Sequence, residues 1–216
     1  LLFGCWNVGA WHFASLGEES SLFQNFWYGF LEVLPIIVVS YVVGLGTEFI
    51  FVFIKGHEIE EGFLVSGLLI PLIVPIDTPL WMIAVATIFA VVIGKEVFGG
   101  TGMNIVNPAL TARAFLFFAY PSKMSGDKIW VSGLEKGEGV VDGFSGATPL
   151  AEAAAATESI QLSTSDMFFG FIPGSIGETS TLAILLGAVF LLYTGIASWK
   201  IMLSVFVGGS VMGLLF

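Results

Sequence analysis

Long apolar runs separated by short polar interruptions dominate the chain. Residues 31–54, 179–198 and 201–216 are almost wholly apolar, and the first run belongs to a predicted helix over 23–54. About 20 apolar residues in a helix cross the hydrocarbon core of a bilayer. These runs therefore predict membrane-spanning helices.

Two shorter apolar runs, at 63–76 and 80–94, are separated by the sequence PIDTP. Both are shorter than a full span of about 20 residues, and the two prolines force a turn between them. A further apolar helix is predicted over 104–120. Broken helices at membrane depth are shielded by protein or line a cavity. The pattern thus predicts an all-α integral membrane protein, a multi-helix transmembrane bundle with short broken helices.

Polarity divides the chain into three parts. Residues 1–120 hold the first transmembrane segments, residues 121–178 form a polar segment, and residues 179–216 hold further helices. The chain begins and ends within apolar stretches, so we expect a piece of a longer membrane protein.

Lysines at the ends of spans predict the orientation. If both short runs cross the bilayer, three lysines share one side: Lys55, Lys95 and Lys200. The positive-inside rule makes that side cytoplasmic. The segment 121–178 is then periplasmic.

Composition excludes several classes of function. Of 216 residues, 56% are hydrophobic and 11% are charged, against roughly 25% charged in soluble domains. The net charge of −10 argues against nucleic-acid binding and against a polybasic membrane-surface patch. Cys5 is the single cysteine, and His12 and His57 lie far apart, so the sequence predicts neither an internal disulfide nor a metal site.

Three charged residues stand within predicted helices: Glu32, which we expect at the membrane interface near one end of its helix, Glu48 and Arg113. A charge at the bilayer centre costs about 2.5–3.5 kcal/mol on insertion scales. Glu48 either lines a cavity or extends to water at the nearby helix end. Arg113 requires an anion, which is either a carboxylate or phosphate of a ligand, or the partner in an ion pair that fixes helix packing.

The Gly-rich sequence GKEVFGGTGMNIVNPA is a candidate cofactor loop. Gly99 and Gly100 expose backbone N–H groups and allow close approach of a flat ligand, and Asn104 and Asn107 follow them. The sequence matches neither a Walker motif nor a full GxGxxG fingerprint. The alternative is a Gly-rich re-entrant turn.

The sequence DGFSGATPLAEAAAAT, residues 142–157, predicts a turn followed by a helix start. Thr148 fits the N-cap position and Pro149 the first helical position. Thr148 either only caps this helix, or its hydroxyl carries a phosphorylated ligand stabilised by the free N–H groups of the helix start.

These passages resemble a known family. Asp142, Ser145, Ala147 and Thr148 resemble the flavinylation motif in which a threonine carries FMN through a phosphoester bond. The sequences GHEIEEGF, GKEVFGGTGMNIVNPAL, ARAFLFFAYP and IPGSIGETSTLA resemble B subunits of sodium-translocating NADH:quinone oxidoreductases. The resemblance runs from about Tyr41 to the C-terminus. The D subunits of Rnf complexes match less well.

The resemblance implies a subunit of a bacterial inner-membrane complex with about ten helices in two repeats. FMN on Thr148 would relay electrons from NADH toward ubiquinone or menaquinone, coupled to Na⁺ export. It also implies a riboflavin site and a quinone or cation pocket at Tyr41, Gly44 and Glu48, within YVVGLGTE. Leu45 departs from the glycine common in the family. The NADH site would belong to a partner subunit.

Two other classes of function stay open on the sequence. An Rnf-type subunit would use ferredoxin and NAD in place of quinone. A channel or transporter of the urea or ammonium kind would frame a pore with the broken helices, and Thr148 would only cap a helix. A bound yellow chromophore separates the redox subunits from the channel and from a purely structural membrane protein.

Overall fold

Helices are the regular elements of this chain wherever its structure is described. The computed structural model describes residues 1–56, 62–100, 102–126, 128–135, 137, 140–141, 144, 146–154 and 163–215. In chain order the elements are α1 (Leu2–Leu16), α2 (Leu22–Lys55), α3 (Phe63–Leu72), α4 (Leu80–Gly94), η1 (Glu96–Phe98), α5 (Pro108–Ala119), η2 (Pro121–Lys123), α6 (Pro149–Ala154), α7 (Thr164–Phe169), α8 (Thr181–Tyr193) and α9 (Trp199–Leu215). No β-strand occurs in the described residues, as the apolar pattern predicts.

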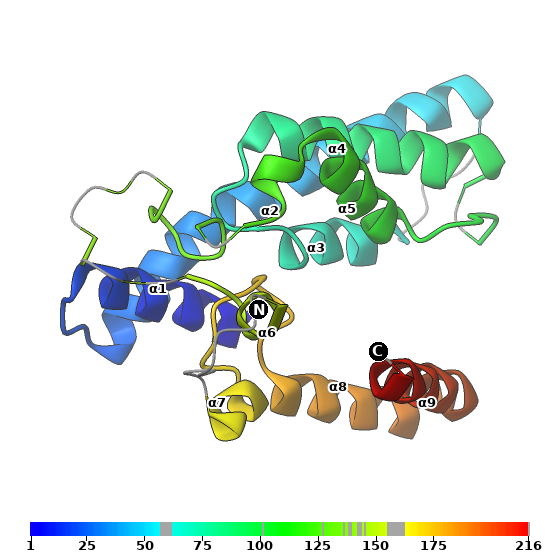
Figure 1. Ribbon diagram of the computed structural model, residues 1–216. Helices are drawn as coiled ribbons and strands as arrows, with labels where there is room; N and C mark the ends of the chain where they lie inside the picture. Colours follow the sequence, from blue (N-terminus) through cyan, green and yellow to red (C-terminus); the bar gives the residue numbers. More distant parts are fainter. Residues whose placement is uncertain are drawn as a thin grey trace.

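Helix α2 is the axis of the fold (Figure 1). Ser21 and Gln24 cap its start reciprocally, and Gly56 ends it in the left-handed conformation at φ 69°. Its 34 residues extend about 50 Å at 1.5 Å per residue, more than the ~30 Å of a bilayer core. Within the described residues, α2 and the segment Leu80–Phe98 are the two helices long and apolar enough to cross a membrane.

Helix α1 packs against the first half of α2 (Figure 1), and glycines let the two helices approach closely. A Cβ atom at Gly29 would overlap the carbonyl of Cys5, and one at Gly9 would overlap the carbonyl of Asn25. Small residues of this kind let two helix backbones approach closely in a membrane.

Helices α3 and α4 pack against α2, and α5 packs on α4 and α3 (Figure 1). Helix α3 stops at Leu72, short of the predicted 76, because Pro75 disfavours helical geometry at the residue before it. Helix α5 starts at Pro108, later than the predicted 104, because the side chain of Asn107 caps it.

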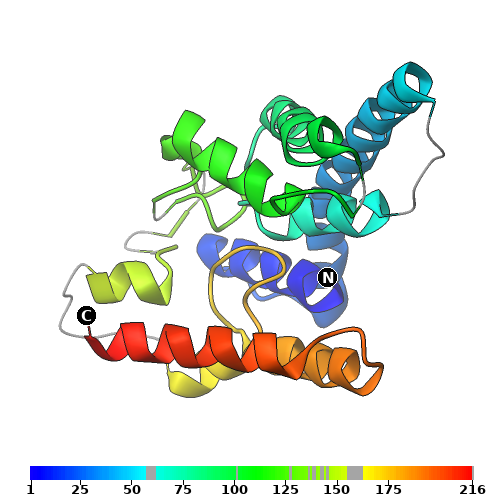
Figure 2. The same cartoon turned by 90° about the vertical axis from the view of Figure 1, so that its right-hand side faces the viewer.

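Helices α8 and α9 lie along one side of the molecule (Figure 2), and no residue in either is buried. Their exposed side chains are large and apolar; Phe206, for example, is 74% exposed. Soluble proteins rarely expose apolar surface on this scale. This surface suits lipid or further helices.

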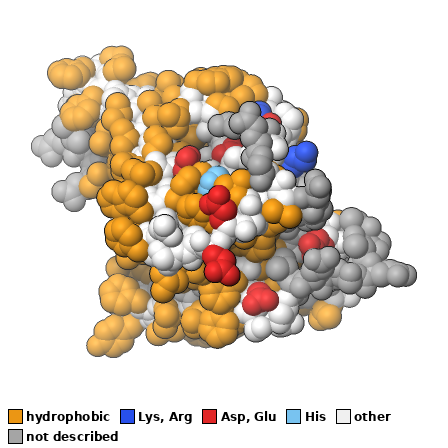
Figure 3. Space-filling view, turned by 90° about the vertical axis from the view of Figure 1, so that its left-hand side faces the viewer, with side chains coloured by type: hydrophobic (Ala, Val, Ile, Leu, Met, Phe, Trp, Pro, Cys, Tyr) orange, Lys and Arg blue, Asp and Glu red, His pale blue; other side chains and the backbone are white. Residues whose placement is uncertain are grey.

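The polar segment attaches to the helix ends through Ser132 and Gly133. His12 of α1 is 2.8 Å from the carbonyl oxygen of Ser132, and Tyr28 of α2 is 3.1 Å from its hydroxyl. The amide of Gly133 donates to Asp77, in the turn between α3 and α4, at 2.9 Å. Figure 3 shows acidic side chains and a histidine gathered on this side of the molecule, flanked by hydrophobic surface.

The opposite end of α2 carries a second polar group. Lys55, the last residue of α2, forms an ion pair with Glu96 of η1 at 3.6 Å. Lys95, which precedes Glu96, forms an ion pair with Glu48 of α2. Lys55 and Lys95 therefore lie at one end of the bundle, away from the attachment of the polar segment.

Candidate functional site: the Thr148 cavity

Thr148 caps helix α6. Its Oγ1 accepts a hydrogen bond from the amide of Ala151 at 3.3 Å, and Pro149 is the first helical residue, as the sequence predicts. Ala147 beside it is buried. Asp142 and Ser145, which with Thr148 resemble a flavinylation motif, lie outside the described residues.

Thr148 also lines a cavity of ≈490 Å³. This volume is within the range of roughly 300–1,000 Å³ typical of small-molecule pockets. Segments far apart in the sequence form its wall: Arg113, Trp130, Thr148, Pro149, Leu150, Met167, Ile172, Pro173, Gly174, Ser175, Glu178, Thr179 and Thr181. The cavity thus brings together two of the predicted cofactor residues, Thr148 and Arg113.

Arg113 reaches the cavity from α5 and is held by two acceptors. Its Nη1 donates to the carbonyl of Ile73 at the end of α3 and to Oε2 of Glu178 at 3.2 Å. Ser175 Oγ donates to the same Glu178 oxygen at 2.7 Å. The side chains of Arg113 and Glu178 are 35% and 53% exposed. Arg113 therefore has the ion-pair partner that the sequence requires, and this pair lies in the cavity wall.

The segment that carries Glu178 is fixed to the helices. The amide of Gly177 donates to the carbonyl of Leu72 at 2.8 Å, and Asn7 of α1 donates to the carbonyl of Ile172 at 2.9 Å. A Cβ atom at Gly4 would overlap the carbonyl of Ile176. Glu178 and Ser175 were not predicted as site residues, although the Pro-Gly-Ser-Ile-Gly-Glu sequence that carries them is a polar signal among apolar helices.

The Gly-rich sequence lies elsewhere. Gly99 and Gly100 take positive φ angles of 122° and 99° after η1, Asn104 donates to the carbonyl of Val106 at 3.3 Å, and Asn107 caps α5. None of these four residues lines the Thr148 cavity. They lie in the connection between α4 and α5, and their expected role at a cofactor stays a prediction.

Tyr41 and Gly44 pack α2 against α3. The Tyr41 hydroxyl donates to the carbonyl of Leu64 at 2.7 Å, and a Cβ atom at Gly44 would overlap the ring of Phe63. The space beside Gly44, within the expected quinone or cation pocket, is filled by that ring.

Glu48 is buried rather than extended to water. It is 5% exposed, and it pairs with the ammonium of Lys95, which is also 5% exposed. Arg113 forms its ion pair with a different carboxylate, that of Glu178. Because Lys95 is buried in this ion pair, its position is weaker evidence for the cytoplasmic side than that of a lysine exposed at the membrane surface.

Gly44→Ala should destabilise the protein by about 1–3 kcal/mol, the usual effect of overpacking, because the new methyl group meets Phe63. Gly46→Ala is the matched control on the same helix, since no atom lies within 4 Å of a Cβ atom there. The measurement is thermal unfolding in detergent. Equal unfolding temperatures for the two variants would show that the α2–α3 packing is wrong.

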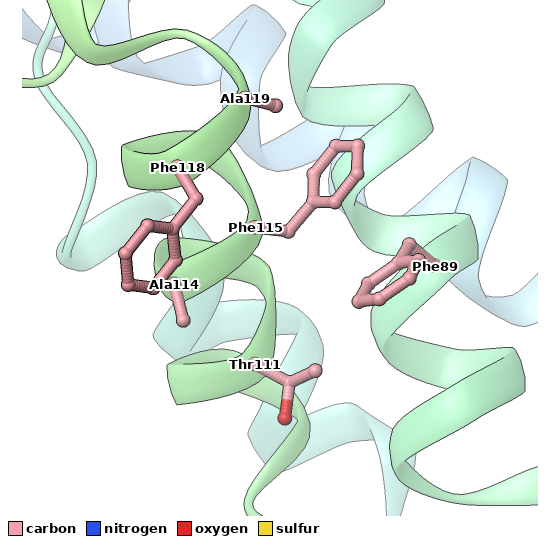
Figure 4. Close-up of a pocket in the computed structure, with 6 residues that line it drawn as sticks. All are labelled: Phe89, Thr111, Ala114, Phe115, Phe118 and Ala119. Carbon is pink, nitrogen blue, oxygen red and sulfur yellow. The ribbon is translucent and has the colours of Figure 1, made fainter.

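A second cavity, of ≈440 Å³, opens between α4 and α5. Figure 4 shows Phe89 of α4 facing Phe115 of α5; their ring centroids are 4.7 Å apart and the rings are stacked. Thr111, Ala114, Phe118 and Ala119 complete the lining. This apolar groove cannot be recognised from the sequence, because its aromatic residues are indistinguishable there from ordinary membrane-facing ones.

Together, the all-helical fold, the apolar outer surface and the cavity lined by a threonine and an arginine are those of a helical membrane protein with a cavity of ligand size. The chain belongs to the NQR2, RnfD, RnfE family, whose profile matches residues 1–216.

Relatives named as the B subunit of Na(+)-translocating NADH-quinone reductase are similar to this chain, as the motifs predict. The relative from Chromohalobacter salexigens is 51% identical over 92% of this chain and 47% of its own length. The relative from Ectopseudomonas mendocina is 45% identical over 96% of this chain and 56% of its own length. The relative from Neisseria meningitidis serogroup B is 41% identical over 100% of this chain and 59% of its own length. The chain thus spans about half the length of these relatives.

Proposed function

We propose that this chain is the flavin-bearing part of the B subunit of a Na⁺-translocating NADH:quinone oxidoreductase. FMN is joined through its phosphate to Oγ1 of Thr148 and relays electrons toward quinone, coupled to Na⁺ export. The observation that supports this most is the shared cavity of the Thr148 hydroxyl and the Arg113 guanidinium. The names of the relatives support the same reaction.

The residues of the cavity fit such a group. Thr148 Oγ1 accepts the Ala151 amide in its cap hydrogen bond, and an esterified oxygen retains lone pairs for that bond. Trp130, Leu150 and Met167 give the wall apolar surface, which suits a flat aromatic ring. When bound, FMN supplies reversible electron transfer at a fixed position, and the chain's own residues orient it and set its electrostatic environment.

The wider assembly is part of the proposal. Its partners are the other subunits of an inner-membrane redox complex, quinone, Na⁺ and the lipid bilayer, and a riboflavin site belongs to it. A role for Glu48 in quinone or cation handling now involves Lys95, because a cation approaching the carboxylate meets that ammonium. An Rnf-type role is distinguished by its electron donor, since such a complex oxidises ferredoxin and reduces NAD rather than quinone.

Mass spectrometry tests the attachment directly. The peptide containing Thr148, from the complete protein made in its native host, should carry the mass of FMN less one water. In-gel fluorescence of the denatured protein should show the same flavin. An unmodified peptide together with a non-fluorescent band would contradict the proposed function.

We further propose that residues 121–178 face the periplasm. A cysteine replacing the exposed Lys128 should react with a membrane-impermeant maleimide in intact spheroplasts, because the polar segment attaches at the end of the bundle opposite Lys55. A cysteine replacing the exposed Asn104 is the control for the other side and should react only after lysis. Native Cys5 is buried and gives little background. Reversed labelling of the two variants would reverse the topology.

A further inference from the structure

We propose that Arg113 and Glu178 together bind the pyrimidine edge of the flavin ring carried by Thr148. This inference rests on the proposed function and extends it from the point of attachment to the recognition of the ring. The juxtaposition that carries it is a cation and an anion, paired at 3.2 Å, in the wall of the cavity that Thr148 also lines.

The guanidinium has donors available for a ligand. In the described part of the chain, both of its hydrogen bonds use Nη1, to Ile73 and to Glu178. A guanidinium has five N–H groups in a planar fork, so the Nε and Nη2 groups supply three more. The side chain is 35% exposed, and it lines the cavity, where a ligand can reach these donors.

Glu178 is held as an acceptor beside those donors. Ser175 and Arg113 both donate to Oε2, which fixes the carboxylate while Oε1 retains lone pairs for a ligand donor. The Gly177 amide ties the adjoining backbone to α3, so this acceptor has a defined position. A fixed donor group and a fixed acceptor group thus stand side by side in one wall.

The flavin ring has a matching edge. Its pyrimidine ring presents a carbonyl at C2, an N–H at N3 and a carbonyl at C4, in the order acceptor, donor, acceptor. Arg113 donates to a carbonyl and Glu178 accepts from N3–H. A phosphate alone would offer only acceptors and would be repelled by the Glu178 carboxylate, so the pair suits the ring edge better than it suits the phosphate.

The charges of the pair act on the ring in opposite directions. Reduction by two electrons with uptake of one proton leaves one negative charge on the ring system, at the N1–C2 carbonyl region; the electrons come from the upstream carriers of the proposed function. The Arg113 cation stabilises this charge and the Glu178 anion opposes it. The two side chains therefore set the reduction potential of the flavin between them.

A purely structural ion pair makes a different prediction. Arg113 also ties α5 to the end of α3 through the Ile73 carbonyl, and loss of that contact lowers stability whatever the ligand does. Removal of either charge would then weaken the fold without opposite effects on the flavin. The direction of the potential shift separates the two roles.

The test is a redox titration of the Thr148 flavin in the complete purified complex, with attachment verified by in-gel fluorescence. In Arg113→Gln the reduced-to-oxidised ratio at a fixed potential should fall, and in Glu178→Gln it should rise, each on the order of fivefold, the scale of a single charge interaction at about 4 Å in water. Arg113→Lys keeps the charge and should recover most of the potential but not the ring-edge hydrogen bonds, seen in the flavin absorption spectrum.

Lys123 and Glu135 provide the matched control. They form an ion pair in the same polar segment, with side chains 30% and 41% exposed, and neither lines the cavity. Lys123→Gln and Glu135→Gln should leave the potential unchanged. If flavin stays on Thr148 and its potential is the same in Arg113→Gln, Glu178→Gln and the wild type, the inference is overturned while the attachment stands. If the wild-type complex itself carries no covalent flavin, this result instead contradicts the proposed function.

Discussion

Thr148→Ala should abolish covalent flavin entirely, because the hydroxyl oxygen is the only atom through which the phosphate is joined to this side chain. The fold should survive, since loss of an N-cap costs about 0.5–2 kcal/mol. The measurement is the flavin fluorescence of the denatured band, compared with the amount of assembled complex. Electron transfer to quinone should be lost with the flavin.

Thr181→Ala is the control for this variant. Thr181 lines the same cavity and its hydroxyl donates to the Met167 carbonyl at 3.4 Å, but it lies outside the flavinylation motif. Its replacement should leave flavin content unchanged. Full fluorescence in Thr148→Ala would place the flavin on another residue and contradict the proposal.

Lys95→Met should destabilise the protein by about 3–5 kcal/mol, the usual effect of removing one partner of a buried ion pair. The ammonium is withdrawn from a Glu48 carboxylate that is only 5% exposed, and water cannot replace it there. Unfolding in detergent, followed by helical circular dichroism, measures the effect. The double variant Lys95→Met, Glu48→Gln removes both charges and should recover much of the stability.

The surface pair formed by Lys123 and Glu135 again supplies the comparison. Lys123→Met should cost at most about 1 kcal/mol, as is usual for exposed ion pairs. If Lys95→Met is no more destabilising than Lys123→Met, this result contradicts the buried ion pair of Lys95 with Glu48.

The apolar pattern predicts where the helices lie along the chain, but it does not predict which side chains contact one another between them. The range 23–54 predicts α2 to within one residue at each end, because the run is long, apolar and bounded by a capping serine and a glycine. The limits of α3 and α5 were less accurate, because a proline and an asparagine cap shorten them by local geometry. Helix limits are in general the least certain part of such a prediction.

The partners of charged side chains depend on contacts between distant segments. Glu48 and Lys95 are 47 residues apart, and Arg113 and Glu178 are 65 residues apart. The sequence shows that each charge in an apolar run requires a partner, but periodicity does not choose among the available ones. The motif around Thr148 is local and is visible in the sequence, whereas the cavity that Thr148 lines is assembled from five separate segments of the chain.

The close contact of α1 with α2 has a mechanical consequence. Because backbone atoms touch at Gly9 and Gly29, these two helices cannot slide or rotate past each other without separating. The segment that bears Glu178 packs against α1 of this pair through Asn7 and Gly4. Helices α8 and α9 differ from this pair, because no residue in either is buried within the described part of the chain.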